Sequence, residues 1–195
     1  MGKRRTKRQR GTLTFGLLLA GLVLGSVPAA FPSLLAATEV VVQVPEKGKS
    51  SGLPVPRFVS LKSDKVNVRR GPSTDQSILW VFSRAGLPVE VIAEFENWRR
   101  VRDSEGADGW VFHSLLSGRR TVLVSPWSKS QSGSVQIPLH RRRSTSSGVV
   151  AQLQPGVLGN LVACDGSWCE LYVQDHAGYV QQEKLWGVYR DEKIE

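Results

Sequence analysis

The sequence has few residues of the kinds that build metal and redox sites. Its 195 residues include only two cysteines, three histidines and one methionine. The histidines, His113, His140 and His176, are scattered along the chain, and no second cysteine pair accompanies Cys164 and Cys169. A zinc site needs about four such ligands at close spacing. We therefore predict neither a metal nor a cofactor.

The sequence also lacks an apolar run of the length that a membrane-spanning helix needs. The run at residues 12–27 has 16 residues, whereas a spanning helix needs about 20. Six basic and no acidic residues precede it in residues 1–10, and a stretch of small residues ends at Ala37. These are the three parts of a secretory signal peptide. We expect residues 1–37 to be that signal, with an uncleaved inner-membrane anchor facing the periplasm as the alternative.

A strongly basic surface is missing once this signal is set aside. The whole chain has 26 Lys and Arg against 17 Asp and Glu, a formal net charge of +9. Residues 38–195 retain 20 of the basic residues and all 17 acidic ones, which leaves +3 (20 − 17). So small an excess does not indicate nucleic-acid binding. We predict an exported protein, periplasmic or secreted, that has no nucleic-acid partner.

Residues placed as a catalytic pair are not found either. In an exported chain, two cysteines as close as Cys164 and Cys169 indicate a structural disulfide rather than a nucleophile. The acidic loop at residues 103–109 lacks the alternating ligands and the following glutamate of a calcium loop. We predict that the protein is not an enzyme.

What the sequence does contain is a succession of short apolar runs separated by turns. Residues 89–95 alternate between apolar and polar, as a strand with one buried face does, and residues 98–102 follow as its partner after a tight turn. Residues 110–112 and 118–124 predict further strands, with one turn of 3₁₀ helix at residues 113–116 between them. No helical period is sustained after residue 58, so we predict an all-β fold.

This pattern occurs twice, which indicates two copies of one small fold. Residues 86–93 align with residues 156–163 at an offset of 70, and Trp98 aligns with Trp168. With one residue fewer between the copies, Gly109 aligns with Gly178.

The alignment also explains where the cysteines lie. Cys164 and Cys169 fall on Glu94 and Arg99 of the first repeat. Both positions flank one hairpin turn and face each other across two antiparallel strands. The second repeat can therefore place a disulfide where the first can place an ion pair.

The order of these motifs resembles the bacterial SH3 (SH3b-like) domain family. The motifs are the runs at residues 66–73, 86–91, 98–101 and 109–111. A cysteine-flanked tryptophan and the terminal run Leu-Trp-Gly-Val-Tyr at residues 185–189 resemble an exported proteobacterial subgroup of that family. The resemblance covers about residues 58–189 and implies two tandem small SH3-like β-barrels.

The predicted organisation follows from the repeat and the resemblance. It comprises a signal peptide at 1–37, a linker at 38–57, a first domain at 58–124, a joint at 125–134, a second domain at 135–189 and a tail at 190–195.

Tryptophans are the first group of candidate ligand-binding residues. Trp98 and Trp168 either line a groove or pack beside the turn that precedes them. Trp80, which aligns with a valine, is either an exposed aromatic in a binding loop or a partly buried anchor. We expect Trp110 and Tyr179 in the cores. Two further tryptophans, Trp127 and Trp186, are expected to pack between the barrels or against the termini.

Arginines are the second group of candidates. Arg70 precedes Gly-Pro in the first repeat, whereas the second repeat has Arg141, Arg142 and Arg143 in this region. The three arginines could bind carboxylates, phosphates or an acidic protein, or could be a solvated loop tip.

The resemblance implies binding of cell-wall peptides. We therefore expect a non-enzymatic binding or targeting module for peptidoglycan. The alternatives are a protein–protein adaptor of the envelope and, with an uncleaved signal, a membrane-anchored structural protein.

Overall fold

The computed structural model describes residues 46–128 and 135–195. The predicted signal peptide, residues 38–45 of the predicted linker and residues 129–134 of the predicted joint lie outside these ranges. The described residues form short strands and three single turns of 3₁₀ helix, so the predicted all-β fold is confirmed. No helix among them is long and apolar enough to cross a membrane.

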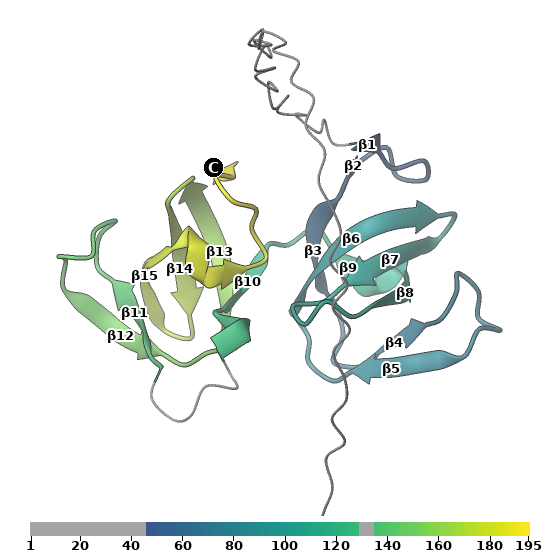
Figure 1. Cartoon of the computed structure of the whole chain (residues 1–195), viewed down its shortest axis with the longest axis horizontal. Coiled ribbons are helices and arrows are strands. Elements are labelled where there is room, and N and C mark those ends of the chain that lie inside the picture. The colour runs from purple at the N-terminus through teal and green to yellow at the C-terminus, as the bar shows by residue number, and fades with distance from the viewer. Residues whose placement is uncertain (1–45, 129–134) are drawn as a thin grey trace, which may run out of the picture. The chain divides into compact units, whose positions relative to one another are not determined.

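The first barrel is a seven-stranded sheet in which every pairing is antiparallel, in the order β5-β4-β8-β7-β6-β3-β9 (Figure 1). Its strands are β3 (Arg57–Leu61), β4 (Val66–Arg69), β5 (Ile78–Phe82), β6 (Pro88–Phe95), β7 (Trp98–Arg102), β8 (Asp108–Phe112) and β9 (Leu116–Ser117). A 3₁₀ turn, His113–Leu115, joins β8 to β9 as the sequence predicts.

The second barrel repeats this arrangement in an eight-stranded antiparallel sheet with the order β12-β11-β15-β14-β13-β10-β16, and β17 pairs with β13. Its strands are β10 (Thr121–Val124), β11 (Ile137–His140), β12 (Val149–Leu153), β13 (Leu158–Asp165), β14 (Trp168–Val173), β15 (His176–Gln181), β16 (Leu185–Trp186) and β17 (Lys193–Ile194). The 3₁₀ turns Pro126–Ser128 and Gln182–Lys184 complete it.

Each barrel has its own aliphatic core. It is built from the inward-facing residues, which alternate with outward-facing ones along each strand. In β8, Gly109 and Val111 are buried while Trp110 between them is only half-buried, and Tyr179 beside buried Val180 repeats this. The prediction that Trp110 and Tyr179 belong to the cores is therefore wrong. They follow the core-facing glycine by one residue and so point to the other face of the strand.

The aligned glycines mark places where two strands nearly touch. A Cβ on Gly109 would lie 2.5 Å from Cγ1 of Val68, and one on Gly178 would lie 2.7 Å from the carbonyl oxygen of His140. Any side chain would displace strand β4 or β11. This close approach is the physical reason for the repeated glycine.

Strand β10 lies in the second barrel, although its residues 121–124 were predicted to end the first domain. It pairs with β13 and β16, and Val122 and Val124 are fully buried in the second core. The predicted tail is also structured, because β17 pairs with Cys164 and Asp165. Both corrections concern pairings between segments far apart in sequence, which local patterns do not encode.

The last part of the predicted linker folds onto the first barrel. Strands β1 (Glu46–Lys47) and β2 (Pro54–Val55) form a hairpin. The Glu94 carboxylate, whose side chain is 1% exposed, accepts hydrogen bonds from the Ser51 backbone and hydroxyl and from Arg57. Burial alone would raise the pKa of Glu94, but these hydrogen bonds and the charge of Arg99 outweigh it and lower the pKa from 4.5 to about 2.

The predicted correspondence between ion pair and disulfide is confirmed. Glu94 and Arg99 are register partners whose side chains lie 3.3 Å apart. Cys164 and Cys169 are register partners in the second barrel and form a disulfide. The same hairpin position is thus held electrostatically in one barrel and covalently in the other.

Side chains from both repeats meet in a seam. The Trp186 indole N–H donates to the carbonyl of Pro88 at 3.2 Å, and the Tyr189 hydroxyl donates to buried Glu90 at 3.0 Å. Burial and the negative charge of Glu90 raise the pKa of Tyr189. Trp186 therefore packs as predicted. Trp127 does not, because 51% of it is exposed.

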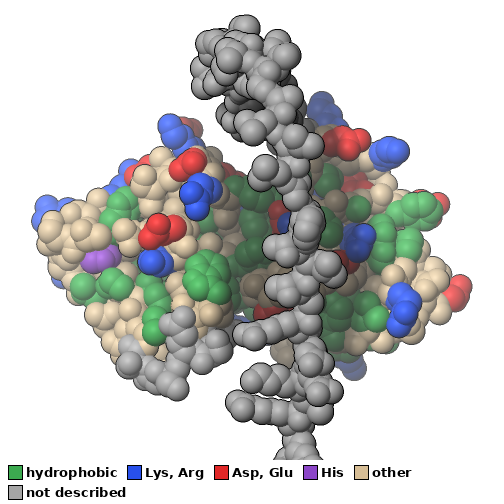
Figure 2. Space-filling model, in the orientation of Figure 1, with side chains coloured by type: hydrophobic (Ala, Val, Ile, Leu, Met, Phe, Trp, Pro, Cys, Tyr) green, Lys and Arg blue, Asp and Glu red, His purple; other side chains and the backbone are tan. Residues whose placement is uncertain are grey.

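The surface carries charges of both signs. On the face drawn in Figure 2, Lys and Arg side chains are interspersed with Asp and Glu. This agrees with the small net charge of the chain after residue 37.

Candidate functional site

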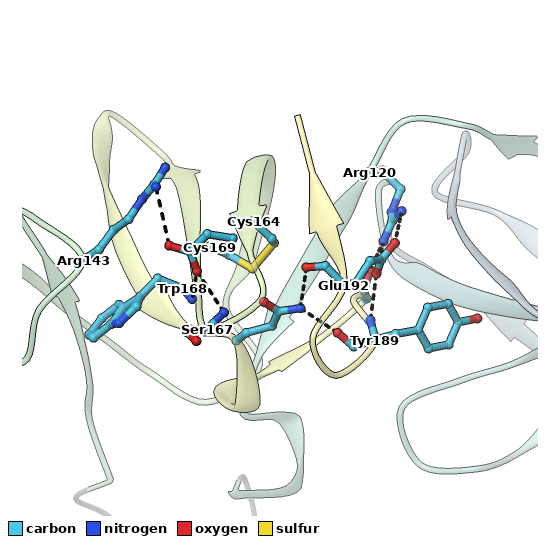
Figure 3. The surroundings of a disulfide bond; sticks show 11 residues. Arg120, Arg143, Cys164, Ser167, Trp168, Cys169, Tyr189 and Glu192 are labelled. Atoms are coloured by element: carbon cyan, nitrogen blue, oxygen red, sulfur yellow. Dashed lines mark hydrogen bonds and ion pairs between the residues drawn. A yellow bond between two sulfur atoms is a disulfide. The ribbon is translucent and has the colours of Figure 1, made fainter. Parts of the chain in front are cut away.

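Arg143 and Trp168, two of the predicted binding residues, meet the same aspartate in the second barrel. Arg143 lies in the loop between β11 and β12, and its guanidinium is 3.5 Å from the carboxylate of Asp165 at the end of β13 (Figure 3). The same guanidinium lies over the ring of Tyr179, 5.4 Å from the ring centroid. Arg143 is thus held between an anion and an aromatic face.

Asp165 fixes the turn that presents Trp168. Its Oδ1 accepts the backbone N–H of Trp168 at 2.8 Å and that of Ser167 at 2.9 Å. These two hydrogen bonds, followed by the charge of Arg143, lower the pKa of Asp165 against the opposing effect of burial. The disulfide closes the same turn from both sides. Trp168 therefore lies in a short hairpin that is held by the hydrogen bonds to Asp165 and by the disulfide.

Trp168 forms part of the wall of a cavity of about 480 Å³. The Trp168 ring is half-buried and packs edge-on against His140 at 5.5 Å between centroids. Buried Leu185 and Val188 contribute apolar side chains to the cavity lining. A cavity with such a lining can hold an aliphatic side chain or an extended backbone.

The cavity is edged by charges of both signs. Glu183, Arg190 and Asp191 line it and are exposed. Buried Gln182 lines it too: its Nε2 donates to the carbonyls of Tyr189 at 2.6 Å and Glu192 at 3.0 Å. Its Oε1 is buried without a donor among the described residues. The site thus offers carboxylates and a guanidinium to a ligand that carries both kinds of charge.

The other predicted binding residues do not join this site. Trp98 is 8% exposed and packs edge-on against Phe112, which favours its packing role. Trp80 is half-buried against Phe82 and lines a separate cavity of about 250 Å³. Arg70 is exposed in the first barrel.

The remaining two arginines of the loop stay apart from the site. Arg141 and Arg142 are exposed, and within residues 46–128 and 135–195 they form no ion pair. The three arginines of the loop are all exposed, and Arg143 differs from the other two in contacting Asp165 and Tyr179.

Sequence reasoning missed Asp165, Tyr179 and Gln182 as members of this site. Asp165 was detectable, since Asp-Gly-Ser after a strand is a typical turn sequence in which the aspartate accepts backbone N–H groups. Tyr179 and Gln182 carry no local signal of this kind.

The described residues give no support to a metal centre. Among them, no three His, Cys, Asp or Glu side chains gather closely enough to hold an ion.

Comparison with known proteins identifies the fold of both repeats. The family model for the bacterial SH3 domain matches residues 62–118 and residues 134–187. No protein with a curated description matches the chain.

Several solved structures are similar to the chain at low identity. NlpC2 and NlpC1 from Trichomonas vaginalis are 11% and 13% identical, each with a TM-score of 0.30, over 68% and 71% of this chain and 48% of each of theirs. An NlpC/P60 family protein from Bacillus cereus is 10% identical with a TM-score of 0.28, over 71% of this chain and 58% of its own. The chain thus spans about half the length of these proteins.

Proposed function

Because the chain belongs to the bacterial SH3 domain family, we propose that it is an exported, non-enzymatic module that binds peptidoglycan peptides at the cavity beside Trp168. The single observation that carries this proposal is the hairpin turn in which Asp165 accepts two backbone N–H groups and so fixes Trp168 in the wall of that cavity. Arg143 contacts the same carboxylate from the neighbouring loop. A side chain held rigid before binding loses little conformational freedom when the ligand arrives.

The composition of the cavity matches the chemistry of a wall peptide. Such peptides are short and flexible, carry free carboxylates and amino groups, and have small aliphatic side chains. Arg190 suits a ligand carboxylate, while Glu183 and Asp191 suit an amino group. Leu185 and Val188 suit the aliphatic parts.

Export has support from the described second barrel and from the N-terminal sequence. The disulfide between Cys164 and Cys169 is of a kind that persists in oxidising compartments such as the periplasm. The basic and apolar segments at residues 1–27 fit a signal peptide.

Co-sedimentation with purified sacculi tests this function. The whole chain is expressed, the exported protein is purified with its disulfide intact, and the pelleted fraction is measured against protein concentration. We expect saturable pelleting that Trp168→Ala weakens by about tenfold, as expected for truncation of an aromatic anchor. Arg143→Ala should weaken it as well, because Arg143 contacts the aspartate that sets the turn.

Arg142→Ala is the matched control, since Arg142 lies next to Arg143 in the same loop but is solvated. It should pellet like the unaltered protein. Absence of pelleting above that of an inert protein would refute wall binding and direct the search to protein partners in the envelope.

A further inference from the structure

A second cavity lies next to the first, on the other side of Gln181. It has a volume of about 230 Å³, and its lining includes Trp127, Gln136, Gln181 and Lys184. Gln181 lines both cavities, and His140, which lines this one, packs against Trp168 of the other. The two cavities are therefore neighbours on the second barrel.

Trp127 gives this second cavity an exposed aromatic wall. It lies in the 3₁₀ turn Pro126–Ser128 and is 51% exposed, although Pro126 and Ser125 before it are buried. Exposure alone does not distinguish it, because Tyr172 is equally exposed, but Trp127 lines a concave site and Tyr172 does not.

The backbone under Trp127 is fixed and strained. Ser125 has a φ of +35°, a conformation that residues other than glycine seldom adopt. Its N–H donates to the carbonyl of Lys184 at 2.7 Å, its side-chain hydroxyl donates to the same oxygen at 3.2 Å, and its own carbonyl accepts the N–H of Ser128 at 3.0 Å. Strain that the surroundings enforce in this way is concentrated at functional sites.

Polar groups around the cavity are available for a ligand. Among the described residues, no hydrogen bond engages the side-chain amides of Gln136 and Gln181 or the indole N–H of Trp127. Lys184 adds a cation whose contact in this part of the chain is the exposed Glu183, at 3.3 Å. An aromatic face with amide donors and acceptors beside it is the combination that a sugar ring requires, because one face of the ring presents C–H bonds and its rim presents hydroxyl and acetamido groups.

We propose that this cavity is a subsite for an N-acetylated amino sugar, with Trp127 stacked on the sugar ring and Gln136 and Gln181 hydrogen-bonded to its acetamido and hydroxyl groups. Its volume is below the range of about 300–1,000 Å³ of sites for larger ligands, which favours one ring over a peptide segment. Peptidoglycan joins a peptide to an amino sugar, so neighbouring cavities suit both parts of one ligand. The inference rests on the proposed function for its choice of polymer, but the sugar can be tested alone.

The test uses a tetrasaccharide of N-acetylglucosamine, which contains no peptide, added to the exported protein labelled with ¹⁵N. We expect saturable shifts of the Trp127 indole N–H and the Gln136 and Gln181 side-chain amides. Trp127→Ala should weaken the binding by about tenfold. Tyr172→Ala is the matched control because Tyr172 is also an aromatic of the second barrel and also 51% exposed, and it should leave the affinity unchanged.

The outcomes separate the sugar subsite from the peptide site. If the tetrasaccharide causes no saturable shift while a sugar-free wall peptide still binds in a Trp168-dependent way, the sugar subsite is refuted and the proposed function stands. If Trp127→Ala binds the tetrasaccharide as tightly as the unaltered protein does, the sugar lies elsewhere and the inference is also refuted. If the tetrasaccharide binds and the wall peptide does not, the proposed peptide site is the one that fails.

Discussion

Replacing Glu94 by glutamine should strongly lower the free energy of unfolding. Glu94 lies far in sequence from the proposed binding site, so the effect concerns stability. Its carboxylate accepts hydrogen bonds from Ser51 and Arg57 and lies 3.3 Å from Arg99. A pKa lowered from 4.5 to about 2 corresponds to about 3 kcal/mol of folding stability at pH 7. We therefore expect Glu94→Gln to lower the free energy of unfolding by about 3 kcal/mol, since the amide leaves two arginines without their anion.

The sign of the pH dependence follows from the lowered pKa. A carboxylate with a folded-state pKa below its unfolded value stabilises the fold above the unfolded pKa, and this contribution fades as the pH falls through the folded pKa. The difference between the original protein and Glu94→Gln should therefore be constant above about pH 5 and shrink between pH 4.5 and 2.

Urea unfolding at pH 7, 5 and 3 measures this difference. Glu105→Gln is the control, because Glu105 is an exposed glutamate in the loop between β7 and β8. It should change the free energy of unfolding by less than about 0.5 kcal/mol. A loss for Glu94→Gln no larger than that of the control, or one that does not shrink at pH 3, would refute the electrostatic role of Glu94.

Three further predictions concern stability. Gly109→Ala should lower the free energy of unfolding, measured in urea, by about 1–3 kcal/mol, because the new Cβ would meet Val68. Gly118→Ala is the control and should be nearly neutral, because the space around Gly118 is open. Equal losses for the two variants would contradict the close-approach explanation. Changing Cys164 and Cys169 together to alanine should lower the melting temperature, because losing the disulfide of so short a loop lowers the free energy of unfolding by about 2 kcal/mol. An unchanged melting temperature would show that the disulfide is dispensable for stability. Tyr189→Phe should cost about 1.5–3 kcal/mol in urea unfolding because it removes a hydrogen bond to a buried carboxylate. A neutral result would mean that this hydrogen bond does not stabilise the fold.

The parts of the fold that local patterns encode were predictable from the sequence. Alternation placed a strand at residues 89–95 and its partner at 98–102, and the structure has β6 and β7 there. The offset between repeats placed Cys164 opposite Cys169 correctly, since a short hairpin fixes its own register.

The parts that depend on long-range pairing were not predictable in this way. Strand β10 has the pattern of any apolar strand, and nothing in residues 121–124 states which barrel will accept it. Tyr179 seemed a core residue because it follows a glycine, whereas that glycine occupies the inward position. In the site, Arg143 and Trp168 were candidates from the sequence. Their meeting through Asp165 depends on the β11–β12 loop reaching the end of β13.

The most direct test of the central claim is an NMR titration of the ¹⁵N-labelled exported protein with a soluble, sugar-free wall peptide. The account predicts saturable shifts of the Trp168 indole N–H and of the backbone amides of Ser167 and Gln182, which line the cavity of about 480 Å³. It also predicts that Trp168→Ala weakens the binding by about tenfold, so that the remaining shifts saturate only at a correspondingly higher peptide concentration. Shifts confined to the first barrel, or no saturable shift at all, would contradict the claim that the second barrel binds wall peptides beside Trp168.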